Sequence, residues 1–294
     1  MGNLLELNDV SLVYDAESGT KVRAVDGVSF SVRRGEVFGL VGESGCGKTT
    51  TGKVIVKLLQ PTSGTVTYDG RDITKIRSRG ALLDYRSRVQ MIFQDPYASL
   101  DPRMKVKDIL AEGLRIHKRI SSERELERKV AELLLTVGLR EDYASRYPHE
   151  FSGGQRQRIG IARALSLDPE FLVCDEPISA LDVSIQAQII NLLSRLKREK
   201  NFTYLFISHD LSIVRYLSDR VGVMCAGRLV ELGSAEAVYT DPLHPYTQSL
   251  ISAIPRPDPI SEQERRRVAY RPESFDGQVF REAKPGHYVL EAAS

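Results

Sequence analysis

The strongest constraint on the fold of this chain is a short apolar segment, 37–41, that leads directly into a glycine-rich stretch. Its nearly continuous apolar character is typical of a strand that is buried on both faces of a parallel sheet. Residues 42–49 read Gly-Glu-Ser-Gly-Cys-Gly-Lys-Thr and match the pattern G-x-x-x-x-G-K-[ST]. Residues 48–59 then favour a helix that ends near Pro61. This order of strand, glycine turn and helix predicts an α/β fold.

The chemistry of the 42–49 stretch predicts binding of a triphosphate, ATP, together with Mg²⁺. Its glycines Gly42, Gly45 and Gly47 let backbone N–H groups approach phosphate closely, and the helix start adds partial positive charge. Lys48 supplies a point charge to the terminal phosphates, and the Thr49 hydroxyl is a ligand for Mg²⁺. The predicted phosphate site also includes Glu43, Ser44, Cys46 and Thr50. A structural glycine turn is the competing interpretation, and the position between an apolar strand and a helix argues against it.

A pair of acids follows a second apolar strand, predicted at 171–174. Asp175 at its carboxyl end is suited to hold Mg²⁺ through water. Glu176 is then in a position to orient and deprotonate an attacking water. Two solvated acids at a strand end are common in isolation. Together with the glycine-rich stretch, they favour an enzyme that hydrolyses ATP.

A second candidate anion site is Ser152-Gly153-Gly154-Gln155, which precedes an apolar helical pattern. Ser152 is a suitable N-cap, and we expect the glycines to leave the N–H groups of the first turn bare. One triphosphate does not need two such sites in one domain, so this one would serve a nucleotide held by another subunit. From these residues alone, a plain capped helix is the default interpretation.

The composition excludes some classes of function. Lys and Arg number 41 against 39 Asp and Glu in 294 residues, which leaves no electrostatic footprint for wrapping nucleic acid, although a local basic patch stays open. Three cysteines, Cys46, Cys174 and Cys225, lie far apart and form neither a metal pattern nor a disulfide framework, which fits a reducing, cytoplasmic location. We find no signal-peptide pattern and no apolar run of about 20 residues, so other chains would have to supply any membrane-spanning part.

The remaining patterns predict an α/β core, a helical insert at about 95–167 and a C-terminal extension. Further strands are predicted at 4–7, 10–14, 28–32, 65–68, 89–93, 203–208, 220–225 and 228–231, and helices at 123–137 and 184–199. A short helical pattern follows Gly233, and prolines between Pro242 and Pro259 favour an extended boundary segment. We expect the polar tail from Ser261 to be loosely packed.

The order of the motifs resembles that of the ATP-binding-cassette family over residues 4–235. In sequence these are 42–49, Gln94, 152–155, 175–176, Ser179-Ala180-Leu181-Asp182 and His209. The resemblance implies a P-loop NTPase (RecA-like) core with an antiparallel β subdomain and an inserted α-helical subdomain. It divides the chain into a nucleotide-binding domain at 1–235 and an extension at 236–294.

The same resemblance implies roles for single residues. Tyr14 would stack on adenine, although from its pattern alone it would be a strand-core tyrosine. Gln94 would contact Mg²⁺ and the attacking water, and His209 would reach the γ-phosphate, although a lone histidine after a strand is usually unremarkable. Asp182 would link the two sites of a dimer, in which 152–155 closes on the partner's ATP.

A narrower resemblance connects residues 93–103 and 242–247 with the ATPases of oligopeptide and dipeptide importers. It implies two membrane-spanning permease subunits, a second, related ATPase (favouring a heterodimer over a homodimer) and, indirectly, an external substrate-binding protein, with no nucleic acid. The chain would lie on the cytoplasmic face of the cell membrane as a peripheral subunit. Nickel and oligosaccharides remain alternative cargoes. Many relatives have a cysteine-rich segment here, but no cysteine follows Cys225, so we predict no iron–sulfur cluster.

Two rival classes and one residue stay open at this point. A non-transport cassette protein acting on DNA or ribosomes usually has paired cassettes or long coiled-coil inserts, and neither pattern occurs. A P-loop kinase or GTPase does not need 152–155, and the guanine-reading Asn-Lys-x-Asp pattern is missing from the sequence. Cys46 either fills a variable loop position, which we favour, or is a thiol of lowered pKa at a helix start.

Overall fold

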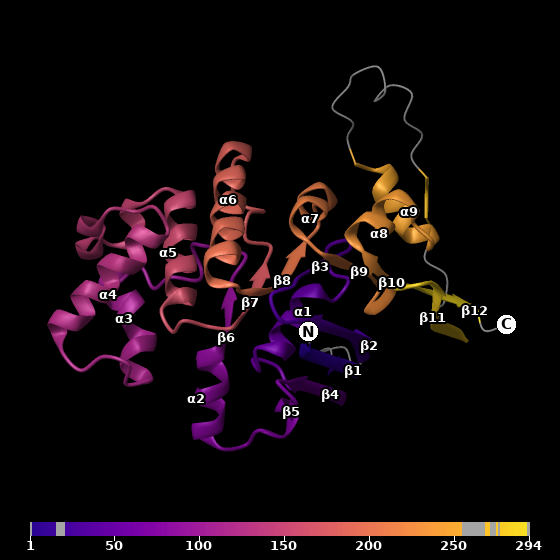
Figure 1. The fold of residues 1–294 in the computed structure, drawn as a ribbon, viewed down its shortest axis with the longest axis horizontal. Helices are drawn as coiled ribbons and strands as arrows, with labels where there is room; N and C mark the ends of the chain where they lie inside the picture. The colour runs from indigo at the N-terminus through magenta and orange to yellow at the C-terminus, as the bar shows by residue number, and fades with distance from the viewer. Residues whose placement is uncertain (1, 16–20, 255–267, 271–274, 276, 293–294) are drawn as a thin grey trace. The chain divides into compact units, whose positions relative to one another are not determined.

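The computed structural model describes residues 2–15, 21–254, 268–270, 275 and 277–292. The chain forms two compact units, which are drawn in Figure 1. Unit 1 combines Met1–Thr74 with Leu205–Ser294, and unit 2 is Lys75–Tyr204. Among the described residues, no helix is both long enough and apolar enough to cross a bilayer.

The first sheet of unit 1 is antiparallel, in the order β2-β1-β4-β5. Its strands are β1 (Asn3–Asp15), β2 (Lys21–Arg33), β4 (Ser63–Tyr68) and β5 (Arg71–Asp72). The strands predicted separately at 4–7 and 10–14 are one strand, β1, with a register shift between Leu7 and Val10. Asp9 there has a φ of 50°, and this left-handed residue forms the irregularity that the sequence pattern read as a break.

The second sheet of unit 1 has the order β11-β12-β10-β9-β3-β8 (Figure 1). Its strands are β3 (Val37–Val41), β8 (Thr203–Ser208, which begins in unit 2), β9 (Arg220–Cys225), β10 (Arg228–Ser234), β11 (Gln278–Lys284) and β12 (His287–Ala292). All residues of β3 are buried, and β3 pairs in parallel with β9, which confirms the predicted buried strand. β9 and β10 are antiparallel and meet at Ala226-Gly227, both of which have positive φ.

In the described part of unit 1, four α-helices lie after strands of this sheet or in the C-terminal region of the chain. They are α1 (Lys48–Ile55), α7 (Leu211–Leu217), α8 (Ala235–Thr240) and α9 (Pro245–Ser252), with the 3₁₀ turn η1 (Ile73–Lys75) at the unit boundary. α1 starts where the sequence predicts but ends earlier than residue 59. The chain turns at Lys57, whose φ of 55° is incompatible with a continuing helix.

Unit 2 contains the whole of the predicted helical insert, 95–167. Its elements are α2 (Arg79–Arg88), β6 (Val89–Ile92), α3 (Val106–Ile116), α4 (Glu123–Thr136), η2 (Glu141–Ser145), η3 (Pro148–Glu150), α5 (Gly153–Leu165), β7 (Phe171–Asp175) and α6 (Val183–Lys200). β6 and β7 pair in parallel. α4 begins at the Ser122 cap and buries Leu126, Val130, Leu133 and Leu134, the apolar positions whose spacing predicted this helix.

The expectation of a loosely packed tail is wrong for residues 277–292. They form the β11–β12 hairpin, and β12 extends the sheet of unit 1 by pairing antiparallel with β10. Val289 and Leu290 are buried in this arrangement, which gives the hairpin an apolar anchor. Pro255, Pro257, Pro259 and the start of the predicted tail, 261–267, lie outside the described residues.

Candidate functional site

The 42–49 loop in unit 1 has a shape that only glycine allows at two positions. Gly42 follows β3 with a φ of 148°, and a Cβ there would lie 2.2 Å from the Met224 carbonyl oxygen. Gly47 has a φ of 106°, and its Cβ would lie 2.2 Å from the Ala24 carbonyl oxygen. Any side chain at either position would therefore displace neighbouring backbone, so the glycines at both ends of the loop are structural requirements.

The loop wraps around the amino group of Lys48. This side chain is only 4% exposed, and its Nζ donates hydrogen bonds to the carbonyl oxygens of Gly42 (2.8 Å) and Glu43 (2.7 Å). α1 begins at Lys48, so the ammonium group and the positive end of the helix belong to the same loop. Thr49 and Thr50 on the first turn are half-buried. This arrangement gathers positive charge and backbone N–H groups, as an anion site requires.

The structure decides between the two interpretations of Cys46. Its side chain is buried, and its Sγ lies 3.6 Å from Lys48 Nζ. Burial raises the pKa of the Cys46 thiol, and the opposing effect of the Lys48 charge is smaller. Burial therefore argues against a thiol of lowered pKa and favours Cys46 as a loop-filling residue.

One contact of the loop comes from a residue that sequence reasoning did not assign. The backbone N–H of Glu43 donates a 2.9 Å hydrogen bond to the hydroxyl of Tyr246, on α9 in the same unit. Tyr246 lies in the 242–247 motif that identified the subfamily resemblance. The motif was therefore noticed, but nothing in its local pattern indicated a contact with the loop.

In unit 2, two of the predicted catalytic residues are in direct contact. The side-chain amide of Gln94 donates a 2.8 Å hydrogen bond to Glu176 Oε2. Glu176 follows β7 with a φ of 43°, and its carbonyl oxygen accepts hydrogen bonds from Ser179 N and Oγ. A non-glycine residue in this conformation carries strain, and such residues concentrate at functional sites. Asp175 beside it is almost completely buried, as expected of an acid that holds a ligand at a strand end.

The 152–155 segment forms a capping box at the start of α5. Ser152 Oγ accepts from Gln155 N, and Gln155 Oε1 accepts from Ser152 N. The expectation of a bare first turn is therefore wrong for Gln155 N–H. Gly154 has a second reason to be glycine, because a Cβ there would lie 2.5 Å from Ile185 Cγ2 on α6. The interpretation of 152–155 as the capped start of a helix is confirmed, and a capped helix start does not exclude an anion site.

The other predicted residues are found on exposed surfaces of their own units. The Tyr14 side chain on β1 is 40% exposed, which contradicts its interpretation as a strand-core tyrosine. His209 is exposed directly after β8. Asp182 is the N-cap residue of α6, where its side chain forms no capping hydrogen bond. Tyr14, 42–49 and His209 belong to unit 1, whereas Gln94, 152–155, 175–176 and Asp182 belong to unit 2.

Comparison with known proteins supplies independent evidence on the fold and the relatives. A family model described as ABC transporter matches residues 25–179, and one described as the C-terminal region of oligopeptide/dipeptide transporters matches residues 230–282. The oligopeptide transport ATP-binding protein OppF of Bacillus subtilis (strain 168) is 57% identical over 98% of this chain and 95% of its own length. The dipeptide transport ATP-binding protein DppF of Lactococcus lactis subsp. cremoris (strain MG1363) is 52% identical over 98% of this chain and 93% of its own length.

Solved structures agree with this assignment. A dimeric post-hydrolysis state of the ATP-binding cassette MJ0796, bound to ADP and Pi, is 27% identical with a TM-score of 0.72, and covers 79% of this chain and 98% of that one. CbiO1 of Clostridium perfringens, described as part of an ABC transporter complex, is 28% identical with a TM-score of 0.70 over 82% of this chain and 92% of its own. These matches confirm the predicted P-loop NTPase fold, and the chain belongs to the ABC transporter family.

Proposed function

We propose that this protein is the ATP-hydrolysing subunit that powers import of oligopeptides or dipeptides across the cytoplasmic membrane through separate permease subunits. The observation that carries the proposal is the match of residues 230–282 to the C-terminal region of oligopeptide/dipeptide transporters. Full-length relatives such as the OppF and DppF proteins bear names for the same activity. Residues 236–294 would then be the extension characteristic of this group.

The proposed chemistry assigns hydrolysis to a small set of side chains. Lys48 holds the terminal phosphates, and its burial within the 42–49 loop supports this role. Glu176 is the general base for the attacking water, and the Gln94 amide fixes the direction of its carboxylate. His209 would contact the γ-phosphate, and Tyr14 offers an exposed ring for adenine.

The residues proposed for Mg²⁺ fit that ion chemically. Thr49, Gln94 and Asp175 offer a hydroxyl, an amide oxygen and a buried carboxylate, and Mg²⁺ prefers such hard oxygen ligands. No group of three or more His, Cys, Asp or Glu residues suited to a metal occurs among the described residues. This agrees with Mg²⁺, which is usually held by one or two protein groups together with phosphates and water. The bound ion would neutralise charge that develops on the phosphates.

The proposed working form is a pair of cassettes. Ser152, Gly153, Gly154 and Gln155 would close on ATP held by the partner, and Asp182 would link the two sites. We favour a second, related ATPase as this partner, so that the assembly is a heterodimer. Permease subunits would dock near Gln94 and Tyr97, whose ring is 59% exposed. The chain would therefore act at the cytoplasmic face of the membrane, with an external binding protein as an indirect partner.

The cargo is tested by reconstituting the chain with its co-purifying permease subunits, partner ATPase and binding protein in liposomes. Di- to pentapeptides, oligosaccharides and nickel would each be supplied to the external face, and ATP hydrolysis would be measured. The proposal expects stimulation by peptides alone. Stimulation by nickel or oligosaccharides alone would show that the cargo is not a peptide. Co-purification with DNA or ribosomes in place of membrane subunits would refute the proposed role in transport.

A further inference from the structure

The backbone of Glu43 is bonded at both of its polar groups. Its N–H donates to the Tyr246 hydroxyl at 2.9 Å, and its carbonyl oxygen accepts from Lys48 Nζ at 2.7 Å. Tyr246 is only 3% exposed. Burial raises the pKa of Tyr246 above its usual range, so the group is a neutral hydroxyl at physiological pH. One residue of the loop therefore connects a side chain of the C-terminal extension with the lysine proposed to hold phosphate.

The start of α9 holds Tyr246 in a fixed place. His244 caps this helix, because its Nδ1 accepts a hydrogen bond from Tyr246 N at 3.1 Å. Pro245 occupies the first helical position, where its fixed φ favours the helix. The Tyr270 ring packs edge-on against the Tyr246 ring, with 5.3 Å between centroids. The hydroxyl of Tyr246 therefore reaches the loop from a rigid support.

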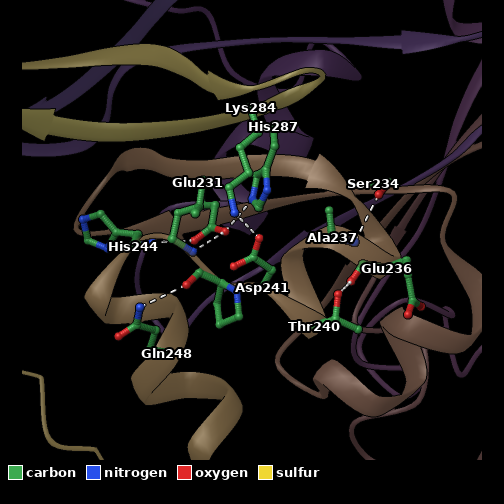
Figure 2. Close-up of polar contacts among 12 residues, drawn as sticks. Glu231, Ser234, Glu236, Ala237, Thr240, Asp241, His244, Gln248, Lys284 and His287 are labelled. Atoms are coloured by element: carbon green, nitrogen blue, oxygen red, sulfur yellow. Dashed lines mark hydrogen bonds and ion pairs between the residues drawn. The ribbon is translucent and has the colours of Figure 1, made fainter.

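A buried acid ties the segment before α9 to the sheet, as Figure 2 shows. The carboxylate of Glu231 on β10 is fully buried and accepts hydrogen bonds from Leu243 N (3.0 Å) and His244 N (2.9 Å). His287 Nε2 on β12 lies 2.7 Å from the same carboxylate. The ion pair of Lys284 with Asp241 adds a second connection from the hairpin. Contacts with the C-terminal hairpin and with Glu231 therefore hold in place the segment before α9, the helix that carries Tyr246.

We infer that Tyr246 is a positioning residue for the phosphate-binding loop, and that through it the C-terminal extension sets the affinity of this loop for ATP. The inference rests on the proposed function of the loop. Holding the Glu43 backbone in place preorganises the carbonyl that orients Lys48, and a preorganised site loses less conformational freedom when the triphosphate binds. Tyr246 then acts on ATP binding through the backbone of Glu43.

The test compares the full chain with its Tyr246→Phe variant, which removes only the hydroxyl. The dissociation constant for AMP-PNP with Mg²⁺ would be measured by isothermal titration calorimetry. Tyr239→Phe is the matched control, because Tyr239 is a buried tyrosine of the same extension whose hydroxyl forms no hydrogen bond to the 42–49 loop in the described structure. We expect the constant to rise about 2- to 10-fold in Tyr246→Phe, the range for one neutral hydrogen bond, and to stay unchanged in the control.

Hydrogen–deuterium exchange supplies a readout that a general loss of stability would not produce. In the wild type, the Glu43 amide should exchange slowly, and in Tyr246→Phe it should exchange faster while β3 and α1 keep their protection. Wild-type affinity in Tyr246→Phe would overturn the inference and leave the proposed function standing. Fast exchange of Glu43 in the wild type would overturn it without any variant. A wild-type chain that binds no AMP-PNP would refute the nucleotide-binding function itself.

Discussion

The side-chain amide of Gln94 donates a hydrogen bond to the carboxylate of Glu176, with 2.8 Å between nitrogen and oxygen. The two residues are 82 positions apart in the sequence, and the contact holds one oxygen of the acid in a defined direction. The other oxygen is then oriented as a proposed general base requires. This contact makes Gln94 part of the proposed catalytic geometry as well as a predicted Mg²⁺ ligand.

Replacing Gln94 with alanine should therefore lower the turnover number more than the apparent affinity for ATP. We expect kcat of the reconstituted transporter to fall about 10- to 100-fold, because a misdirected base loses efficiency. The KM for ATP should change by less than about threefold, since the loop with Lys48 is intact. Steady-state ATPase assays at varied ATP measure both quantities. A large rise in KM with unchanged kcat would argue against a role in directing Glu176.

Two helix-capping serines allow the effect of a cap on stability to be distinguished from an effect on ATPase activity. Ser152 caps α5 and Ser122 caps α4, each through its side-chain oxygen. Either change to alanine should lower the free energy of unfolding by about 1 kcal/mol, as measured in urea. Only Ser152→Ala should also lower ATPase activity of the assembled transporter, because only this segment is proposed to close on the partner's nucleotide. Equal activity losses in both variants would reduce the role of Ser152 to a helix cap.

The three thiols should resist alkylation in the folded protein. Cys46, Cys174 and Cys225 are all buried, and burial raises the pKa of each, to about 11 for Cys225. Thiolate is the reactive form, so iodoacetamide at pH 7.5 should label none of them within minutes and all three in urea. Mass spectrometry of digested samples counts the labels. Rapid labelling of Cys46 in the native protein would contradict the buried loop geometry.

The cap of α9 should make the protein sensitive to mild acid. Burial lowers the pKa of His244 below its ordinary value of about 6.5, and the nearby Glu231 carboxylate opposes this only in part. The folded state therefore binds fewer protons than the unfolded state, so this contribution to stability is complete above about pH 6.5 and is lost as the pH falls through the lowered pKa. Asparagine is also a good N-cap, so His244→Asn should flatten the dependence of Tm on pH between 7 and 5. If the slope of Tm against pH is the same in His244→Asn as in the wild type, other titratable groups cause the acid sensitivity.

The sequence predicted those parts of the fold that depend on local pattern. β3, β8 and β9 have the predicted bounds, because each is a mostly apolar run that is followed by a polar or glycine-containing turn. The β11–β12 hairpin escaped prediction because charged and polar residues interrupt the apolar pattern of its strands. β12 gains stability from pairing with β10, and the local sequence pattern gives no indication that these two strands are neighbours.

The same distinction applies to the candidate site. The motif residues were found because their spacing is fixed within single turns, as in the loop around Lys48. The hydrogen bond between Glu43 and Tyr246 joins residues 203 positions apart, and the buried Glu231 reads as an ordinary strand residue. Contacts of this kind depend on tertiary packing, so only the folded structure reveals them.

The central claim, that Glu176 drives hydrolysis of ATP held by the 42–49 loop, is tested most directly by Glu176→Gln. Glutamine keeps the shape and the contact with Gln94 but cannot take a proton from water. The measurement is the rate of ATP hydrolysis by the reconstituted transporter, alongside its affinity for MgATP. We predict affinity within about threefold of the wild type and a rate lower by about 100-fold or more. Hydrolysis at the wild-type rate would contradict the account.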